Sequence, residues 1–106
     1  SVISFDVSGQ PYKVARSTLL QYPDTMLGVL VQRWSRGDEP IFIDRDPQRF
    51  KYIVDFYRNG KIVLPISTSL MEMQQEAAFF GLPVNDDTIK IDASQISVLR
   101  ASLLNL

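Results

Sequence analysis

The first fifteen residues alternate between apolar and polar side chains, which predicts a β-hairpin. Every second residue from Ile3 to Val7 is apolar, and the residues between them are polar. This alternation is typical of a strand that has one buried face. Residues 8–11 contain a glycine and a proline, and residues 12–15 alternate again. We therefore expect two antiparallel strands joined by a short turn.

The segment from residue 41 to residue 64 begins with a strand and a helix. Ile41–Ile43 is an uninterrupted apolar run, which is typical of a short buried strand. Asp46 is a favourable helix N-cap, because its carboxylate can accept a backbone N–H of the first turn. Pro47 suits the first helical position, where its missing N–H costs nothing. The buried stripe of this helix is expected to consist of Phe50, Ile53, Val54 and Tyr57.

The same segment ends in a second extended run. Gly60 can adopt the left-handed conformation that ends a helix, and Ile62–Leu64 reaches as far as Pro65. The most unusual local feature is the loop between the first strand and the helix. There residues 44–46, with the sequence Asp-Arg-Asp, alternate in charge directly beside a buried strand.

Hydroxyl side chains mark the starts of the other helices. Ser17 is expected to cap a short helix that Pro23 ends, and Thr25 is expected to cap a second helix. Ser69 stands three residues before Glu72, which is the spacing of a capping box. Near the C-terminal end, residues 89–92 alternate as in a strand. A last helix is expected to follow a cap at Ser94 and to carry Ile96, Leu99, Leu103 and Leu104.

Together these elements predict an α+β fold. A small mixed sheet would contain the N-terminal hairpin and one further strand, with several short helices around it. The length of 106 residues fits one domain with a single hydrophobic core. We expect residues 1–83 to form the main domain. Residues 84–106 are expected to be a C-terminal extension that packs on this domain or follows it.

Composition narrows the range of environments and partners. The net charge is −1, so no strongly basic surface for nucleic acid or an anionic membrane is expected. The chain has no cysteine and no apolar run of about 18 residues, which favours an intracellular domain without a membrane span. The first residues do not resemble a signal peptide, and the chain does not begin with methionine. We expect an excised part of a longer protein.

The residue types argue against catalysis. Without histidine and cysteine, the chain cannot form a serine–histidine triad, a cysteine–histidine dyad or the usual zinc sites. Asp44 and Asp46 could flank a cation or a substrate. The preferred interpretation is that Asp46 caps the helix and that Asp44 pairs with Arg45 or with a neighbouring chain. We therefore expect no enzyme activity, no cofactor and no metal.

Two further groups have a structural and a functional interpretation. Glu72 and Glu76 lie four residues apart on one helix face and could hold a metal or act in acid–base chemistry. We prefer a cap role for Glu72 and a solvated helix surface for both. Trp34 fits an exposed anchor for a partner and the edge of the core equally well.

Several blocks of the sequence are similar to one known family. They are FDVSGQPY at residues 5–12, STLLQYPDTMLG at residues 17–28 and IFIDRDPQRF at residues 41–50, followed by FYRNGK at residues 56–61 and EAAFFGL at residues 76–82. The chain resembles the potassium-channel tetramerisation domain, which has a BTB/POZ-type fold. The similarity extends over about three quarters of the chain.

The resemblance implies a module that assembles with copies of itself. Such domains form a cyclic ring of four or five subunits, and the charged loop would lie at the polar surface between subunits. Some channel members hold zinc there with a set of histidine and cysteine residues. This chain has neither residue type, so its ring would close without that metal. The subunit-interface residues that the resemblance implies are Lys13, Val14, Arg16, Asp44, Arg45, Asp46 and Arg49.

The parent protein is open to two interpretations at this point. One is a voltage-gated potassium channel, with this domain as a cytoplasmic part that does not itself contact the membrane. The alternative is a soluble KCTD-like adaptor that presents substrates to a cullin ubiquitin ligase. An adaptor would need a partner surface outside the ring, for which Trp34 and the apolar groups near Tyr22 are candidates.

Overall fold

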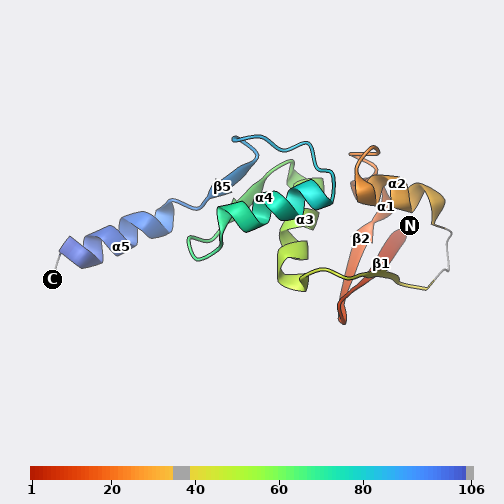
Figure 1. Cartoon of the computed structure of the whole chain (residues 1–106), viewed down its shortest axis with the longest axis horizontal. Coiled ribbons are helices and arrows are strands. Elements are labelled where there is room, and N and C mark those ends of the chain that lie inside the picture. Colours follow the sequence, from red (N-terminus) through yellow and green to blue (C-terminus); the bar gives the residue numbers. More distant parts are fainter. Residues whose placement is uncertain (35–38, 105–106) are drawn as a thin grey trace.

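The N-terminal hairpin supplies two of the strands of a three-stranded sheet (Figure 1). The computed structural model describes residues 1–34 and 39–104, and for residues 95–99 it describes the backbone alone. β1 (Val2–Val7) pairs antiparallel with β2 (Gln10–Ala15) and parallel with β3 (Ile41–Ile43). The strand order is therefore β2-β1-β3, and β2 and β3 lie at opposite edges. This arrangement confirms the predicted mixed sheet of a hairpin and one further strand.

The hairpin turn consists of Ser8 and Gly9, which both have positive φ angles of 47° and 97°. Two successive positive φ angles match the right-handed twist of the flanking strands. Among the residues that the structure describes, Ser8 is the one residue other than glycine with a positive φ angle. Asp6 Oδ1 accepts a hydrogen bond of 2.7 Å from the backbone N–H of Gly9. The turn is therefore held tightly by its own neighbours.

The central helix, α3 (Pro47–Asn59), has the predicted ends. The Asp46 side chain accepts a hydrogen bond from the backbone N–H of Gln48, and Pro47 occupies the first turn. Gly60 ends the helix with a φ angle of 74°. The buried residues of this helix are Phe50, Ile53, Val54, Phe56 and Tyr57, which include all four residues of the predicted stripe.

The other helices confirm two predicted caps and correct two others. Thr25 caps α2 (Met26–Arg33), and Ser69 caps α4 (Leu70–Phe79) through the backbone N–H of Glu72. The predicted cap at Ser17 is wrong, because α1 (Arg16–Leu19) begins one residue earlier and has no side-chain cap. Ser94 is itself the first residue of α5 (Ser94–Leu104), and its backbone N–H donates to Asp92 Oδ1 at 3.0 Å.

A second, two-stranded sheet lies beyond α3. β4 (Ile62–Leu64) pairs in parallel with β5 (Ile89–Ile91), and α4 lies between them in the sequence. The pairing attaches residues 89–91 to the main body, whereas α5 extends away from it (Figure 1). The expected division after residue 83 stays a prediction. No helix among residues 1–34 and 39–104 is long and apolar enough to cross a bilayer.

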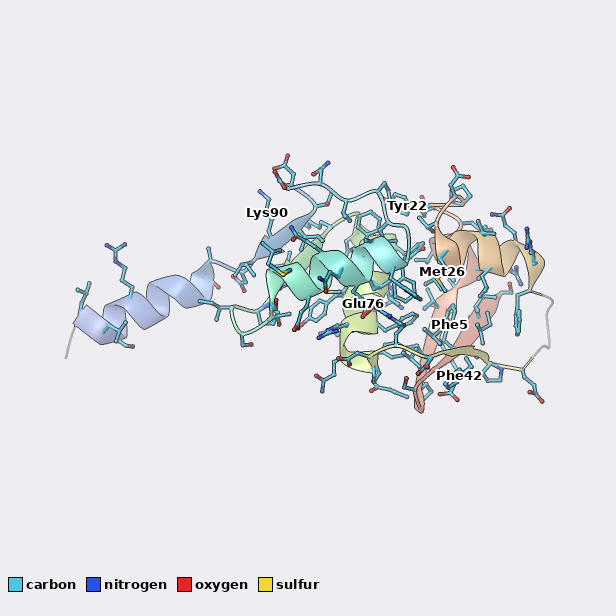
Figure 2. The ribbon with its side chains drawn as sticks, in the orientation of Figure 1. Phe5, Tyr22, Met26, Phe42, Glu76 and Lys90 are labelled. Atoms are coloured by element: carbon cyan, nitrogen blue, oxygen red, sulfur yellow. The ribbon has the colours of Figure 1, made fainter. Side chains whose placement is uncertain are left out.

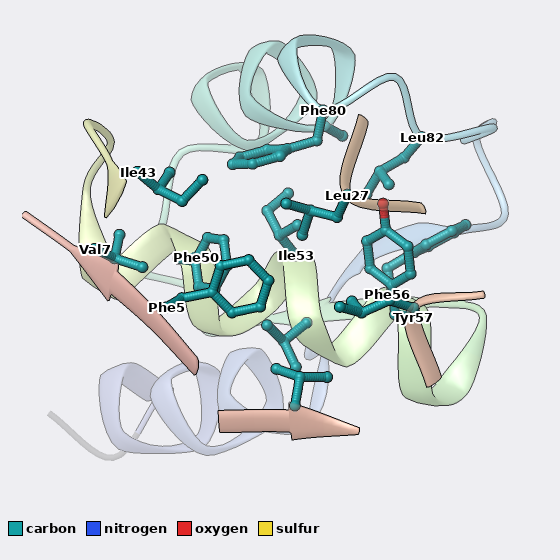
Figure 3. Close-up of a cluster of buried hydrophobic side chains, with 14 of the residues drawn as sticks. Phe5, Val7, Leu27, Ile43, Phe50, Ile53, Phe56, Tyr57, Phe80 and Leu82 are labelled. Carbon is teal, nitrogen blue, oxygen red and sulfur yellow. The ribbon is translucent and has the colours of Figure 1, made fainter. Parts of the chain in front are cut away.

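Aromatic rings join the sheet to the helices in the core (Figure 3). The Phe50 ring of α3 lies 5.5 Å from the Phe5 ring of β1 and 5.7 Å from the Phe80 ring that follows α4. At the other end of α3, the Tyr57 hydroxyl forms a buried hydrogen bond with the Thr25 hydroxyl. Burial raises the pKa of Tyr57. The three helices α2, α3 and α4 thus share one core.

Residue 28, near the start of α2, has no room for a side chain larger than that of glycine. This close packing yields a first prediction. A Cβ at this position would overlap the Tyr22 carbonyl oxygen and lie 2.8 Å from Pro23 Cα. Both are backbone atoms that cannot move aside alone. Gly28→Ala should therefore lower the free energy of unfolding by about 2 kcal/mol or more, although alanine favours helices. Urea denaturation at fixed protein concentration measures the change, and a stabilised variant would contradict this prediction.

Candidate functional site

The candidate site is the corner loop, defined as residues 44–46 between β3 and α3. The hairpin turn holds this loop from one side, because the Ser8 backbone N–H donates to the Ile43 carbonyl oxygen at 3.0 Å. The Ser8 hydroxyl also donates to the Arg45 carbonyl oxygen at 2.8 Å. Asp44 and Asp46 are exposed, and Arg45 is half-buried. The backbone of the loop is therefore fixed while its two carboxylates face outward.

A buried ion pair holds the corner loop from the other side. The Arg45 Nε donates to Glu76 Oε1 at 2.6 Å, and Nη2 of the same guanidinium also contacts this oxygen. Figure 2 labels Glu76 on α4, and its side chain is only 2% exposed. The guanidinium lies over the Phe79 ring, 4.0 Å from its centroid, in a cation–π contact. The pair connects the corner loop with α4, 31 residues later in the chain.

These contacts narrow one expectation and correct another. Asp44 was expected to pair with Arg45 or with a neighbouring chain, and Arg45 is bound to Glu76 instead, which leaves the neighbouring chain. Glu76 was expected on a solvated surface, but it is buried beside Met73, Ala77 and Phe80. Sequence reasoning missed it although a signal exists. Residues 73, 76, 77 and 80 have the spacing of a buried helical stripe, and a carboxylate in such a stripe needs a cation.

A second, more exposed charge cluster follows the corner loop. Arg49 Nη2 donates to Glu72 Oε2 at 2.8 Å, and Arg49 Nε lies 3.7 Å from Asp46 Oδ2. All three side chains are more than a third exposed, so these pairs contribute little to stability. Their effect is to direct the Arg49 charge toward α4. Arg49 thus already has partners within its own chain.

Tyr12 attaches β2 to the start of α3. Its hydroxyl donates to the Pro47 carbonyl oxygen at 2.5 Å, and its ring packs edge-on against Phe50 with centroids 5.0 Å apart. Burial raises the pKa of Tyr12, and the nearby Asp46 and Asp55 carboxylates raise it further. The hydroxyl therefore stays protonated and keeps this hydrogen bond throughout the neutral pH range.

The three remaining predicted interface residues lie in different environments. Arg16 is held within the chain, where its Nη2 donates to the Trp34 carbonyl oxygen at 2.7 Å and its Nη1 donates to the Val31 carbonyl oxygen. The Val14 side chain is 1% exposed and belongs to the core, so only its backbone, on an edge strand, faces outward. Lys13 is exposed, and the described residues include no salt-bridge partner for it.

The surface around the corner loop is hollow and polar. One hollow of about 460 Å³ is lined by the corner loop, Ser8, Pro47, Arg49 and Glu76. A second hollow of about 480 Å³ begins at Asp46 and Tyr12 and extends to the loop before α4, which carries Ser69. The described residues contain no cluster of three or more acidic side chains that could hold a metal ion. The arrangement offers charged hydrogen-bonding groups to a polar partner.

Comparisons with known proteins point to one family. The profile of the BTB/POZ domain matches residues 3–89. The potassium voltage-gated channel protein Shal of Drosophila melanogaster is 38% identical over 79 residues, which is 73% of this chain and 14% of that protein. The A-type voltage-gated potassium channel KCND3 of Homo sapiens and that of Rattus norvegicus are each 35% identical over 83 residues, which is 76% of this chain and 13% of each protein. The chain thus spans about one seventh of the length of these relatives.

The ion pair between Arg45 and Glu76 yields a second prediction, which concerns the free energy of unfolding. Glu76→Gln removes the carboxylate charge and leaves a guanidinium without its anion. We expect a loss of about 2 kcal/mol of unfolding free energy, below the value for a fully buried pair because Arg45 is a third exposed. Glu72→Gln is the matched control, because it removes an exposed arginine-paired carboxylate from the same helix and should cost less than about 1 kcal/mol. Equal losses in urea denaturation would count against the central role of Glu76.

Proposed function

This chain belongs to the BTB/POZ family, as a domain of the potassium-channel tetramerisation type, and from this membership we propose that it is a homo-oligomerisation module. Copies of the chain form a closed ring of four or five subunits. The ring assembles a longer parent protein, and this domain does not itself catalyse a reaction.

One observation carries the proposal: the fold fixes the corner loop from two sides and still directs Asp44 outward. Arg45 and Arg49 have partners within the chain, so they are not available to neutralise Asp44. A rigid, exposed and unneutralised carboxylate suits recognition of a cation on another molecule. Charged groups of this kind steer association and fix register more than they add affinity.

Lys13 is the cation that best complements Asp44. Of the three basic residues outside the corner loop that were expected at the subunit interface, Arg16 and Arg49 are engaged within the chain, which leaves Lys13. Lys13 lies on β2 and Asp44 follows β3, and these strands are opposite edges of the sheet. Contact between Asp44 of one copy and Lys13 of the next would join two different faces. Heterologous contacts of this type close into a ring when the rotation permits it.

The parent protein is proposed to be a voltage-gated potassium channel, with this domain on its cytoplasmic side. The relatives reported above are potassium channels by name. The alternative, a KCTD-like adaptor for a cullin ubiquitin ligase, has less support. One anchor considered for it, Trp34, packs against the core instead. A pull-down with a cullin N-terminal domain distinguishes the two, and stoichiometric capture would favour the adaptor.

A charge exchange tests the proposed contact and gives a third prediction. Asp44→Lys and Lys13→Glu should each place like charges against each other between subunits. We expect each to raise the concentration at which the oligomer dissociates by about tenfold or more. The double variant restores opposite charges and should restore assembly. Sedimentation velocity measures the oligomer over a dilution series.

A control variant and circular dichroism keep this experiment interpretable. Asp86→Lys changes an exposed carboxylate in the turn that precedes β5, which is not among the expected interface residues, and should leave assembly unchanged. Circular dichroism verifies that each variant keeps its helices. An oligomer that resists both single exchanges, or a double variant that dissociates as readily as the single ones, would refute the contact between Asp44 and Lys13.

A further inference from the structure

Ser8 adopts a backbone conformation that is unfavourable for serine. It is the first residue of the two-residue turn between β1 and β2, and its φ angle is 47°. Turns with positive φ angles at both central residues favour asparagine, aspartate or glycine at the first position. Most other residues avoid the left-handed region, because Cβ then lies too close to the following carbonyl oxygen. Serine therefore strains the turn at a position where glycine would not.

Stability of the fold does not account for serine at this position. The Ser8 hydroxyl donates to the Arg45 carbonyl oxygen at 2.8 Å, but the residue is exposed, and water can replace such a hydrogen bond at little net loss. The Ser8 backbone N–H donates to the Ile43 carbonyl oxygen at 3.0 Å, and any residue except proline supplies this donor. Among the described contacts, the one that serine provides and glycine lacks is therefore the hydrogen bond to Arg45.

Both hydrogen bonds from Ser8 act on the backbone around Asp44. The Ile43 carbonyl belongs to the peptide group that precedes Asp44, and the Arg45 carbonyl belongs to the peptide group that follows Arg45. Asp44 thus lies between two peptide groups that one residue holds in place. Ser8 and Asp44 also line the same hollow of about 460 Å³. The ion pair with Glu76 holds the side chain of Arg45, whereas Ser8 holds the backbone from which the Asp44 carboxylate projects.

We propose that Ser8 is a positioning residue for the contact between subunits, and that its hydroxyl sets the orientation in which Asp44 meets the next subunit. The inference rests on the proposed function, because Asp44 is the carboxylate proposed to bind Lys13 of the neighbouring copy. Association loses less conformational entropy when the loop that makes the contact is already ordered. Strained backbone is typical of sites at which the surrounding structure enforces one geometry for such a purpose.

Two substitutions of Ser8 separate positioning from stability. Ser8→Gly and Ser8→Ala both remove the hydroxyl, but glycine also relieves the left-handed strain and alanine does not. Both variants should raise the concentration at which the oligomer dissociates by about fivefold, as measured by sedimentation velocity. Urea denaturation below that concentration should separate them. The midpoint of Ser8→Gly should be at or above the wild-type value, and the midpoint of Ser8→Ala should be below that of Ser8→Gly.

A double substitution tests whether Ser8 acts through Asp44. The effects of two residues that contribute through one contact do not add. In a chain that carries Asp44→Asn, Ser8→Gly should therefore raise the dissociation concentration by less than about twofold. Asp86→Asn makes the same chemical change at an exposed residue in the turn that precedes β5. In that control background, Ser8→Gly should keep its full effect.

The outcomes distinguish this inference from the proposed function. The positioning role is overturned, and the ring is left standing, if assembly is unchanged in both Ser8 variants or is weaker in Ser8→Ala than in Ser8→Gly. A urea midpoint of Ser8→Gly below the wild-type value also overturns it, because the hydroxyl would then serve the fold.

Two further outcomes concern Asp44 and the ring. A full effect of Ser8→Gly in the Asp44→Asn background overturns the inference, because Ser8 would then act on the neighbouring subunit independently of Asp44. Asp44→Asn without any effect on assembly overturns it as well, since there would be no contact at Asp44 to position. A wild-type chain that is monomeric refutes the proposed function itself.

Discussion

The buried carboxylate of Glu76 is the constraint on which the arrangement of this domain depends. A charge removed from water needs a partner of opposite sign, and Arg45 supplies it from the corner loop. The ion pair therefore anchors the corner loop to α4, on the side opposite the contacts from Ser8. Phe79 covers the guanidinium, so one contact joins the sheet edge, the start of α3 and the helix α4.

This internal pairing also determines which charges remain for a partner. The loop has two acids and one base. Arg45 is bound to Glu76, and Asp46 caps α3 and lies near Arg49, so Asp44 is the exposed carboxylate that remains for a partner. An attractive contact then has to come from a cation on a different face of the molecule. Polar recognition between unlike faces suits a ring, because it fixes register and discourages contacts between identical faces. On the proposed mode of assembly, the stability of the fold and the choice of partner depend on the same residue, Arg45.

The fold was largely predictable from the sequence because its signals are local. Alternation revealed the hairpin, and Asp46, Pro47 and Gly60 marked both ends of α3. The parallel pairing of β4 with β5 was not predicted, since the register between segments separated by a helix is not encoded in either segment alone. The corner loop was recognised as unusual, but Glu76 was not foreseen as the partner of Arg45. Residues close to Arg45 in the sequence were considered as its ion-pair partners, whereas Arg45 binds a buried carboxylate 31 residues away.

The central claim is that copies of this chain assemble into a closed ring. Light scattering coupled to size exclusion on the unmodified chain tests it most directly. The account predicts one species with a mass four or five times the 12.1 kDa of a single chain, and this mass should fall as salt screens the polar contacts. A mass of 12.1 kDa at high protein concentration and low salt would contradict the account.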